Sequence, residues 1–110
     1  HTGDSTVAAS SSTFYTIPSG STITIQNILG GAGSVTVGGA KVELYYDPPC
    51  TNVVANMTLI AKAYLSGANF QYNISDNFVG NGTACIRLTR TNLSGGSIEI
   101  YSRWSGYTTP

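Results

Sequence analysis

The sequence has few charged residues. Lysine, arginine, aspartate and glutamate together make up 9% of the 110 residues, and their charges cancel to a formal net charge of zero, whereas soluble domains carry about 25%. Nucleic acids and anionic membrane surfaces both select clustered lysine and arginine. We therefore expect neither nucleic acid as a partner nor insertion into a membrane. A surface with so little charge favours association over mutual repulsion, which is typical of a protein that assembles or carries another solubilising group.

The sequence has one histidine, His1. A Ser-His-Asp arrangement needs a histidine that the fold holds in place, and chain ends are seldom held. Copper chelation by an N-terminal histidine, as in secreted polysaccharide oxidases, needs a second histidine. The five acidic residues show no spacing typical of a glycosidase pair, and the loop around Asp76 has fewer carboxylates than calcium usually takes. We predict no enzymatic activity, no catalytic residue, no cofactor and no metal site.

Long hydrophobic runs are also absent. No segment approaches the roughly 18 consecutive apolar residues of a membrane-spanning helix. The chain starts at His1 and not at methionine, from which we expect a processed N-terminus, most simply one left by removal of a secretion signal. The expected location is extracellular or at the cell surface.

The two cysteines, Cys50 and Cys85, each follow turn-forming residues. An even pair in a secreted chain predicts a disulfide, which would close a loop worth about 3–4 kcal/mol in the chain-entropy model. The alternative is two separate thiols in a reducing compartment. Two cysteines and a distant histidine do not give the ligand spacing of a zinc site.

Alternation of polar and apolar residues indicates β-strands. Thr22, Ile23, Thr24 and Ile25 alternate in the period of a half-buried strand. Lysine, glutamate and leucine are scarce, which disfavours long amphipathic helices. The pattern predicts strands over residues 12–17, 21–28, 34–37, 40–46, 57–65, 69–74, 84–89 and 98–104, with turns at 30–33 and 66–67, an irregular segment at 47–55 and a loop at 75–82.

The alternation also predicts which side chains face the core. They are Val42, Leu44, Tyr46, Met57, Leu59, Ala61, Ala63, Leu65, Phe70, Tyr72, Ile74, Ala84, Ile86, Leu88, Ile98, Ile100 and Trp104. Arg87 and Glu99 each point away from the core residues of their own strands. They are therefore expected to lie on the exposed surface and to pair across neighbouring strands. About seven to nine short strands joined by glycine-rich turns predict an all-β fold, a two-sheet antiparallel β-sandwich of immunoglobulin-like or jelly-roll type over residues 13–110.

Four Asn-X-Ser/Thr triplets begin at Asn56, Asn73, Asn81 and Asn92. None has proline in the middle, and all four are expected at turns, strand starts or outward strand positions, as a covalent glycan requires. The alternative is the ordinary turn chemistry of asparagine.

Four tyrosines, Tyr15, Tyr45, Tyr64 and Tyr101, lie in the strand phase opposite to the apolar residues, and Tyr45, Tyr64 and Tyr101 are the candidates for a binding surface. Exposed tyrosines can stack on sugar rings or form a protein interface. The alternative is ordinary packing between neighbouring strands on a sheet face.

Residues 1–12 are small, nearly uncharged and without a hairpin partner of their own. Such an extended arm, here represented by Thr6, Val7, Ala8 and Ala9, can add as a strand to the open sheet edge of a neighbouring copy. Repeated head to tail, that contact builds a filament. The alternative is a disordered terminus.

Together these features predict a secreted, non-enzymatic structural subunit of an extracellular fibre or pilus-like filament. Its partners would be copies of itself, and it would assemble by strand donation with a possible coat of glycans. The alternative is a carbohydrate-binding or adhesive β-sandwich module. A third hypothesis is a β-sandwich segment of a larger surface or virus-tail protein.

Overall fold

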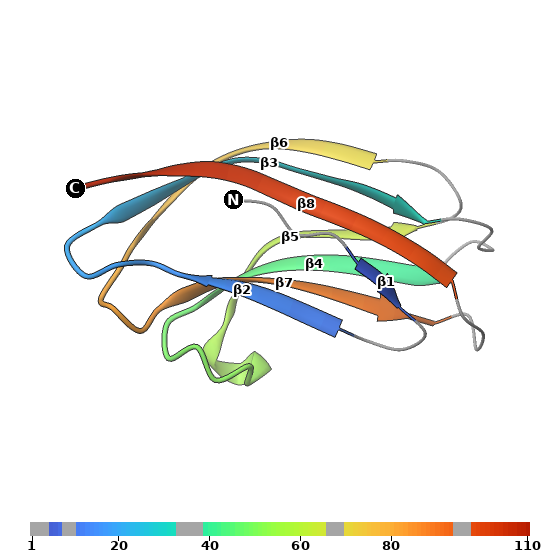
Figure 1. The fold of residues 1–110 in the computed structure, drawn as a ribbon, viewed down its shortest axis with the longest axis horizontal. Coiled ribbons are helices and arrows are strands. Elements are labelled where there is room, and N and C mark those ends of the chain that lie inside the picture. Colours follow the sequence, from blue (N-terminus) through green and yellow to red (C-terminus); the bar gives the residue numbers. More distant parts are fainter. Residues whose placement is uncertain (1–4, 8–10, 33–38, 66–69, 94–97) are drawn as a thin grey trace.

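The computed structural model describes residues 5–7, 11–32, 39–65, 70–93 and 98–110. These residues form strands and one short 3-10 helix, η1 (Figure 1). The elements are β1 (Ser5–Val7), β2 (Ser11–Thr16), β3 (Thr22–Ala32), β4 (Ala40–Asp47), η1 (Val54–Asn56), β5 (Thr58–Leu65), β6 (Phe70–Val79), β7 (Cys85–Asn92) and β8 (Ile98–Thr109). The strand predicted at 34–37 lies outside the described residues.

The strands form two four-stranded sheets, in the orders β1-β8-β3-β6 and β2-β7-β4-β5, and every pairing within them is antiparallel. The sheets lie face to face (Figure 1), which confirms the predicted two-sheet β-sandwich. β1 and β2 follow one another in the chain but belong to different sheets. The start of the chain therefore passes from one layer to the other.

The core lies between the sheets and contains many of the side chains that were predicted to face inward. The buried cluster is Ile17, Ile23, Ile25, Ile28, Ala40, Val42, Leu44, Ala63, Leu65, Ile86, Leu88, Ile100 and Trp104. The interior also holds a charged side chain, Arg90, which is fully buried and whose Nε donates to the Ser102 hydroxyl oxygen at 2.8 Å. Because β7 and β8 belong to different sheets, this bond links the two layers.

Bulges interrupt the alternation in three places. The first bulge lies in β5. The neighbouring residues Leu44 and Tyr45 of β4 pair with Ala61 and Leu59, so Ile60 is an extra residue in β5. A bulge shifts the phase of the strand beyond it. Leu59, predicted to face the core, is therefore exposed, and Ile60 packs against the core instead.

The second and third bulges lie where β3 meets its two neighbours. Opposite the single residue Gln26, β6 has two residues, Ile74 and Ser75, and β8 has none. The exposed Gln26 separates Ile25 from Ile28 so that both can be buried. β8 itself runs through this region without an inserted residue.

Tyr72 is a second predicted core residue that is not buried. It pairs with the buried Ile28 and so has the inward phase, but its side chain is 46% exposed. β6 is the outermost strand of its sheet, where the facing layer covers an inward side chain only in part.

The predicted residue limits of the turn at 30–33 and of the loop at 75–82 were wrong. Gly30 and Gly31 continue β3, and a Cβ on Gly30 would collide with the Tyr101 carbonyl oxygen. That glycine is therefore required for close packing of β3 against β8. The loop begins only after Val79, because β6 continues along β3 as far as the pair Val79–Thr22.

The N-terminal segment is paired within its own chain in the described part. Ser5, Thr6 and Val7 lie opposite Ile100, Glu99 and Ile98 of β8, and Ser11–Thr16 pair with β7. The prediction of a free arm over residues 1–12 thus does not hold for residues 5–7 and 11–12, which cover strand edges of their own sandwich. Ala8 and Ala9 lie outside the described residues.

Candidate functional site

Two edge strands carry features that oppose pairing with another chain. β5 contains the bulge at Ile60 and the exposed Lys62, and β6 contains the bulge at Ile74–Ser75 and the exposed Asp76. Bulges and charged side chains are the usual means by which proteins protect a sheet edge. These features disfavour strand addition at both edges.

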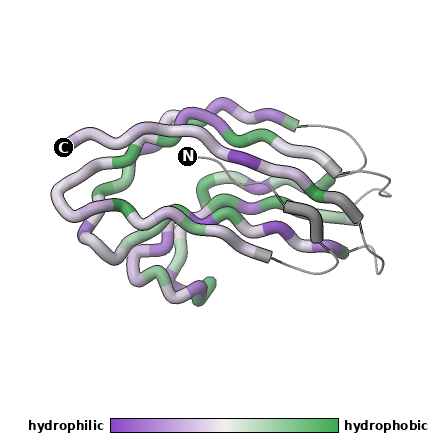
Figure 2. The backbone as a smooth tube through the Cα atoms, viewed as in Figure 1, coloured by the Kyte–Doolittle hydropathy of each residue, from purple (hydrophilic) through white to green (hydrophobic). Residues whose placement is uncertain are grey.

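The edge of β8 has fewer such protections. In the described part of the chain β1 pairs with Ile98–Ile100, and from Ser105 to Thr109 β8 pairs with β3 on one side while no described strand pairs with the other (Figure 1). Residues 105–109, which we call the open edge, contain no charged residue, and Figure 2 shows this part of β8 in pale colours. A row of unpaired backbone amides and carbonyls is a template for another strand.

The outer face of β8 carries Arg103, Ser105 and Tyr107, of which Ser105 and Tyr107 belong to the open edge. They lie opposite Leu29, Asn27 and Thr24 of β3, on the face away from the core. Arg103 and Tyr107 are exposed, Tyr107 to 50%, and Ser105 is half-buried. Gly106 is in the inward phase, where a Cβ would collide with the Thr24 carbonyl oxygen.

Tyr45 is not the exposed platform that the sequence predicts. Its side chain is 9% exposed, and its hydroxyl donates to Glu43 Oε2 at 2.5 Å. β4 is an inner strand, so Tyr45 is flanked by Arg87 on β7 and Leu59 on β5. Alternation indicates the face of a side chain but not the size of the neighbours on that face, which here enclose the ring.

We expect folding stability to fall between pH 10 and pH 12 because of Tyr45. Burial, the hydrogen bond to Glu43 and the Glu43 charge raise the pKa of Tyr45 from its ordinary value of 10.0 to about 12. In this interval the unfolded chain has lost the phenolic proton and the folded chain keeps it, so the stabilisation present below pH 10 is lost as the pH rises. The free energy of unfolding, measured with urea, should fall by about 2–3 kcal/mol over this interval. Tyr45→Phe should abolish this slope, and an unchanged slope would contradict the assignment.

Tyr64 and Tyr101 differ from Tyr45 and from each other. Tyr64 is 59% exposed on the outer face of β5, with Lys62 Nζ 5.0 Å from its ring centroid. Tyr101 is half-buried on the outer face of the other sheet. The structure therefore does not bring the three predicted tyrosines together on one surface.

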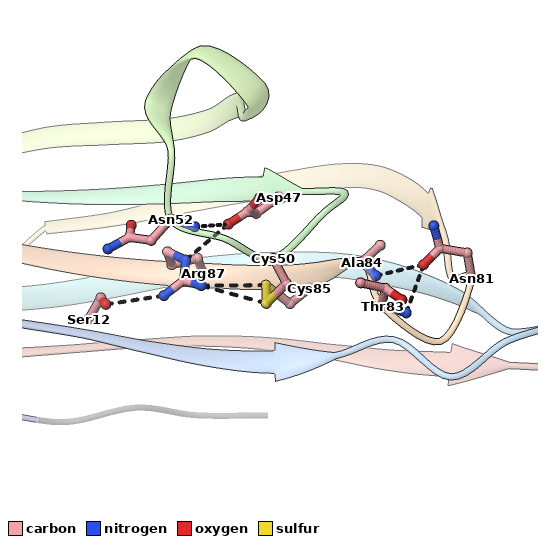
Figure 3. The surroundings of a disulfide bond; sticks show 9 residues. All are labelled: Ser12, Asp47, Cys50, Asn52, Asn81, Thr83, Ala84, Cys85 and Arg87. Atoms are coloured by element: carbon pink, nitrogen blue, oxygen red, sulfur yellow. Dashed lines mark hydrogen bonds and ion pairs between the residues drawn. A yellow bond between two sulfur atoms is a disulfide. The ribbon is translucent and has the colours of Figure 1, made fainter.

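The four glycosylation triplets occupy different environments. Asn56, Asn73 and Asn81 are exposed, and Asn92 is half-buried at the end of β7. The Asn81 side-chain carbonyl oxygen accepts hydrogen bonds from the backbone N–H groups of Thr83 and Ala84 at 2.8 and 2.7 Å (Figure 3), which is the ordinary turn chemistry of asparagine. Asn73 lies in the middle of β6, at the edge of the sheet opposite to the open edge.

Cys50 and Cys85 form a disulfide, as predicted, which joins the loop after β4 to the start of β7 (Figure 3). Arg87 lies over it, with Nη2 3.6 Å from Cys50 Sγ. The Arg87 Nε contacts Asp47 Oδ2 at 3.2 Å, and Nη1 contacts the Ser12 hydroxyl at 3.3 Å. Asp47 is fully buried and Arg87 is 6% exposed, so this is a buried ion pair that ties β2, β4 and β7 together.

The predicted pair of Arg87 and Glu99 was wrong. β7 and β8 belong to different sheets, so the two residues are not neighbours across a strand pair. Arg87 lies opposite Tyr45 of β4 and Phe14 of β2 instead, and its charge is balanced by Asp47.

The same corner contains the candidate metal cluster found among the described residues, Asp47, Cys50 and Cys85, with ligand atoms within 4.8 Å of one another. Metal coordination requires cysteine thiolates, whereas both sulfurs are bonded to each other. Asp47 Oδ2 is already shared by Arg87 and the Asn52 backbone N–H. The cluster does not fit a metal ion while the disulfide is intact.

Comparisons with known proteins show no close relative. No protein-family model and no curated protein matches the sequence. Among solved structures, the chain is similar to the Drosophila NLP core, described in terms of pentamer formation and histone binding, at 18% identity and a TM-score of 0.46 over 100% of this chain and 99% of that one. It is also similar to the infectious bursal disease virus structure (Gx strain), at 10% identity and a TM-score of 0.33 over 98% of this chain and 30% of that one. Likenesses this weak indicate no function.

None of the described residues forms a helix that is long and apolar enough to cross a membrane. No pocket is found among the described residues either. The candidate sites described above are the open edge, the exposed Tyr64 on β5 and the buried disulfide corner.

Proposed function

We propose that this protein is a non-enzymatic structural subunit that assembles with copies of itself, by strand addition at the open edge, into an extracellular fibre or pilus-like filament. The carrying observation is the side of β8 from Ser105 to Thr109, with which no described strand pairs. The low charge of the chain supports association. The disulfide supports an oxidising compartment, such as the outside of the cell.

Two segments of a neighbour can serve as the added strand. The sequence favours the N-terminal arm with Thr6, Val7, Ala8 and Ala9. Because Ser5–Val7 already pair with β8 of their own chain, donation of the arm would be an exchange in which β1 leaves its own sheet. The other segment is β8 itself, whose open edge is available without any exchange.

Self-association of the native secreted protein tests the proposal. We expect electron microscopy and sedimentation velocity to show assemblies, and Ser105→Lys to reduce them strongly, because a charge on an edge strand blocks strand addition. Gln71→Lys is the matched control, since Gln71 is an exposed residue on the already protected β6 edge. Monomers at every concentration would overturn the proposal. Loss of assembly with Gln71→Lys alone would move the contact to β6.

The runner-up is a carbohydrate-binding module, and one observation favours it. Tyr64 is the exposed member of the predicted tyrosine set, with a cation over its ring. Aromatic rings of this kind can stack on sugars. Retention of a monomeric protein on an insoluble polysaccharide, lost in Tyr64→Ala, would favour this function over assembly.

A further inference from the structure

We propose that Asn56 is the site of an N-linked glycan, and that this sugar covers an apolar surface formed by Val53, Val54 and Leu59. The inference goes beyond the proposed function, which depends on the open edge of the other sheet. It assigns the modification to one of the four triplets and names the surface that the glycan covers.

The segment 51–59, which connects β4 to β5, is apolar and accessible to solvent. Every residue in it is exposed or half-buried. Val53, Val54 and Leu59 are among the exposed large apolar residues of the protein, and Val54 is exposed to 67%. Residues 48–61 include no charged residue. Apolar side chains gathered on one exposed and uncharged segment indicate a surface that something else covers.

The short helix η1 presents Asn56 to solvent. None of its residues is buried, and Figure 1 shows it outside the two layers. The chain before it is held by the disulfide at Cys50 and by the hydrogen bond from the Asn52 backbone N–H to Asp47. The chain after it enters β5 directly. Because both ends are fixed to the sandwich, the triplet is held away from the sheets, where a bulky glycan has room.

The turn of η1 places the acceptor beside the apolar side chains. The Asn56 backbone N–H donates to the Val53 carbonyl oxygen at 2.9 Å, and the Met57 N–H donates to the Val54 carbonyl oxygen at 3.1 Å. In a turn of this kind, side chains three residues apart lie one above the other. A sugar on Asn56 therefore starts on the side of the turn that carries Val53. Leu59 follows on the outer face of β5.

Each of the other three triplets lacks one of these properties. The Asn81 side chain is already engaged in two hydrogen bonds that hold its own turn. Asn92 is half-buried. Asn73 is exposed, but its neighbour on the same face of β6 is the polar Gln71. Asn56 is thus the triplet at which an accessible amide and an apolar surface coincide.

The modification is a group transfer from a lipid-linked oligosaccharide phosphate, catalysed by a transferase of the secretion pathway. The Asn56 Nδ2 forms a bond to the anomeric carbon of the first sugar and releases a proton. The bond from that carbon to the phosphate oxygen breaks, and the lipid phosphate leaves with the electron pair. The chain supplies the acceptor amide and, at the third position of the triplet, the hydroxyl of Thr58.

Glycopeptide mass spectrometry of the natively secreted protein tests the assignment. We expect the peptide that contains Asn56 to carry the added mass of an oligosaccharide, and an unmodified Asn56 would overturn the inference. Thr58→Ala should abolish the added mass, because it removes the triplet but keeps Asn56. Thr58→Ser, which preserves the triplet, should retain it. Modification of Asn56 that persists in Thr58→Ala would show a different chemistry.

Binding of an apolar dye tests whether the sugar covers the surface. Dye fluorescence should be higher for Thr58→Ala than for the glycosylated wild type, and adding Val54→Ser to Thr58→Ala should lower it again. Ser75→Ala is the matched control, since it removes the triplet at Asn73 in the other sheet and should leave dye binding unchanged. Equal dye binding with and without the sugar on Asn56 would overturn the covering.

Failure of this inference can be told apart from failure of the proposed function, because mass spectrometry detects the glycan and sedimentation detects assembly. If the native protein assembles but Asn56 is unmodified, the glycan is overturned and the proposed function stands. If Asn56 carries the sugar but the protein is monomeric at every concentration, the proposed function is overturned and the glycan stands.

Discussion

Replacing Asp47 with alanine should destabilise the protein by about 3–5 kcal/mol. Asp47 is fully buried, and its Oδ2 lies 3.2 Å from the Nε of the buried Arg87. Removing the carboxylate leaves the guanidinium in a low-dielectric site without its counter-charge, and it also leaves the Asn52 backbone N–H without its acceptor. A domain of this size has about 5–15 kcal/mol of stability in total, so the midpoint of urea unfolding should fall steeply.

The matched control replaces both charges at once. Asp47→Leu combined with Arg87→Met removes the ion pair and leaves no charge at this corner, and we expect it to be much less destabilising than Asp47→Ala, because buried ion pairs seldom stabilise relative to apolar residues of similar size. A loss below about 1 kcal/mol for Asp47→Ala would show that water reaches Arg87, and the ion pair would not hold the corner together.

The alternation of the sequence is sufficient to predict a two-sheet sandwich and much of its core. Val42, Leu44, Ile86 and Leu88 are buried as their phase requires, because period-two patterning is a local property of a strand. The bulge at Ile60 is not predictable in the same way. It arises where β5 is fitted to β4, and nothing within residues 57–65 alone indicates an extra residue.

The polar contacts depend on which sheet each strand joins. The outward phase of Arg87 is visible in the sequence, but its partner Asp47 becomes a neighbour only once β7 is placed beside β4. Arg90 continues the inward phase of Ile86 and Leu88, which is a signal in the sequence that a charge enters the core. Its bond to Ser102 requires the second layer to be placed.

The open edge could not be predicted from sequence because it is a property of pairing. The pattern predicts a last strand over residues 98–104, whereas β8 continues to Thr109 along β3. That extension takes β8 beyond the reach of the three-residue β1. Low charge favours association, and the described part of β8 has an edge where strand addition can be tested.

Removing the disulfide should cost about 2–4 kcal/mol. The bond closes a sequence separation of 35 residues, for which the chain-entropy model gives about 4 kcal/mol. Cys50 and Asn52 have φ values of 52° and 60°, in a left-handed region that costs non-glycine residues of order 1 kcal/mol. Without the disulfide this turn can relax and recover that cost, so the net loss of stability is smaller than the chain-entropy value. Urea unfolding of Cys50→Ser/Cys85→Ser should show the loss, and a dithiol reductant should reproduce it in the wild type but leave the double variant unchanged.

The disulfide and the ion pair should not act independently, because Arg87 contacts both. Its Nη2 lies against Cys50 Sγ while its Nε contacts Asp47. When the turn relaxes in Cys50→Ser/Cys85→Ser, water gains access to the guanidinium, and the isolated charge left by Asp47→Ala becomes less costly. We therefore expect the triple variant to lose less stability than the sum of the separate losses, by about 0.5–3 kcal/mol. If the losses are additive, the disulfide and the ion pair stabilise the corner independently. If the triple variant loses less stability than the sum, Arg87 couples the two.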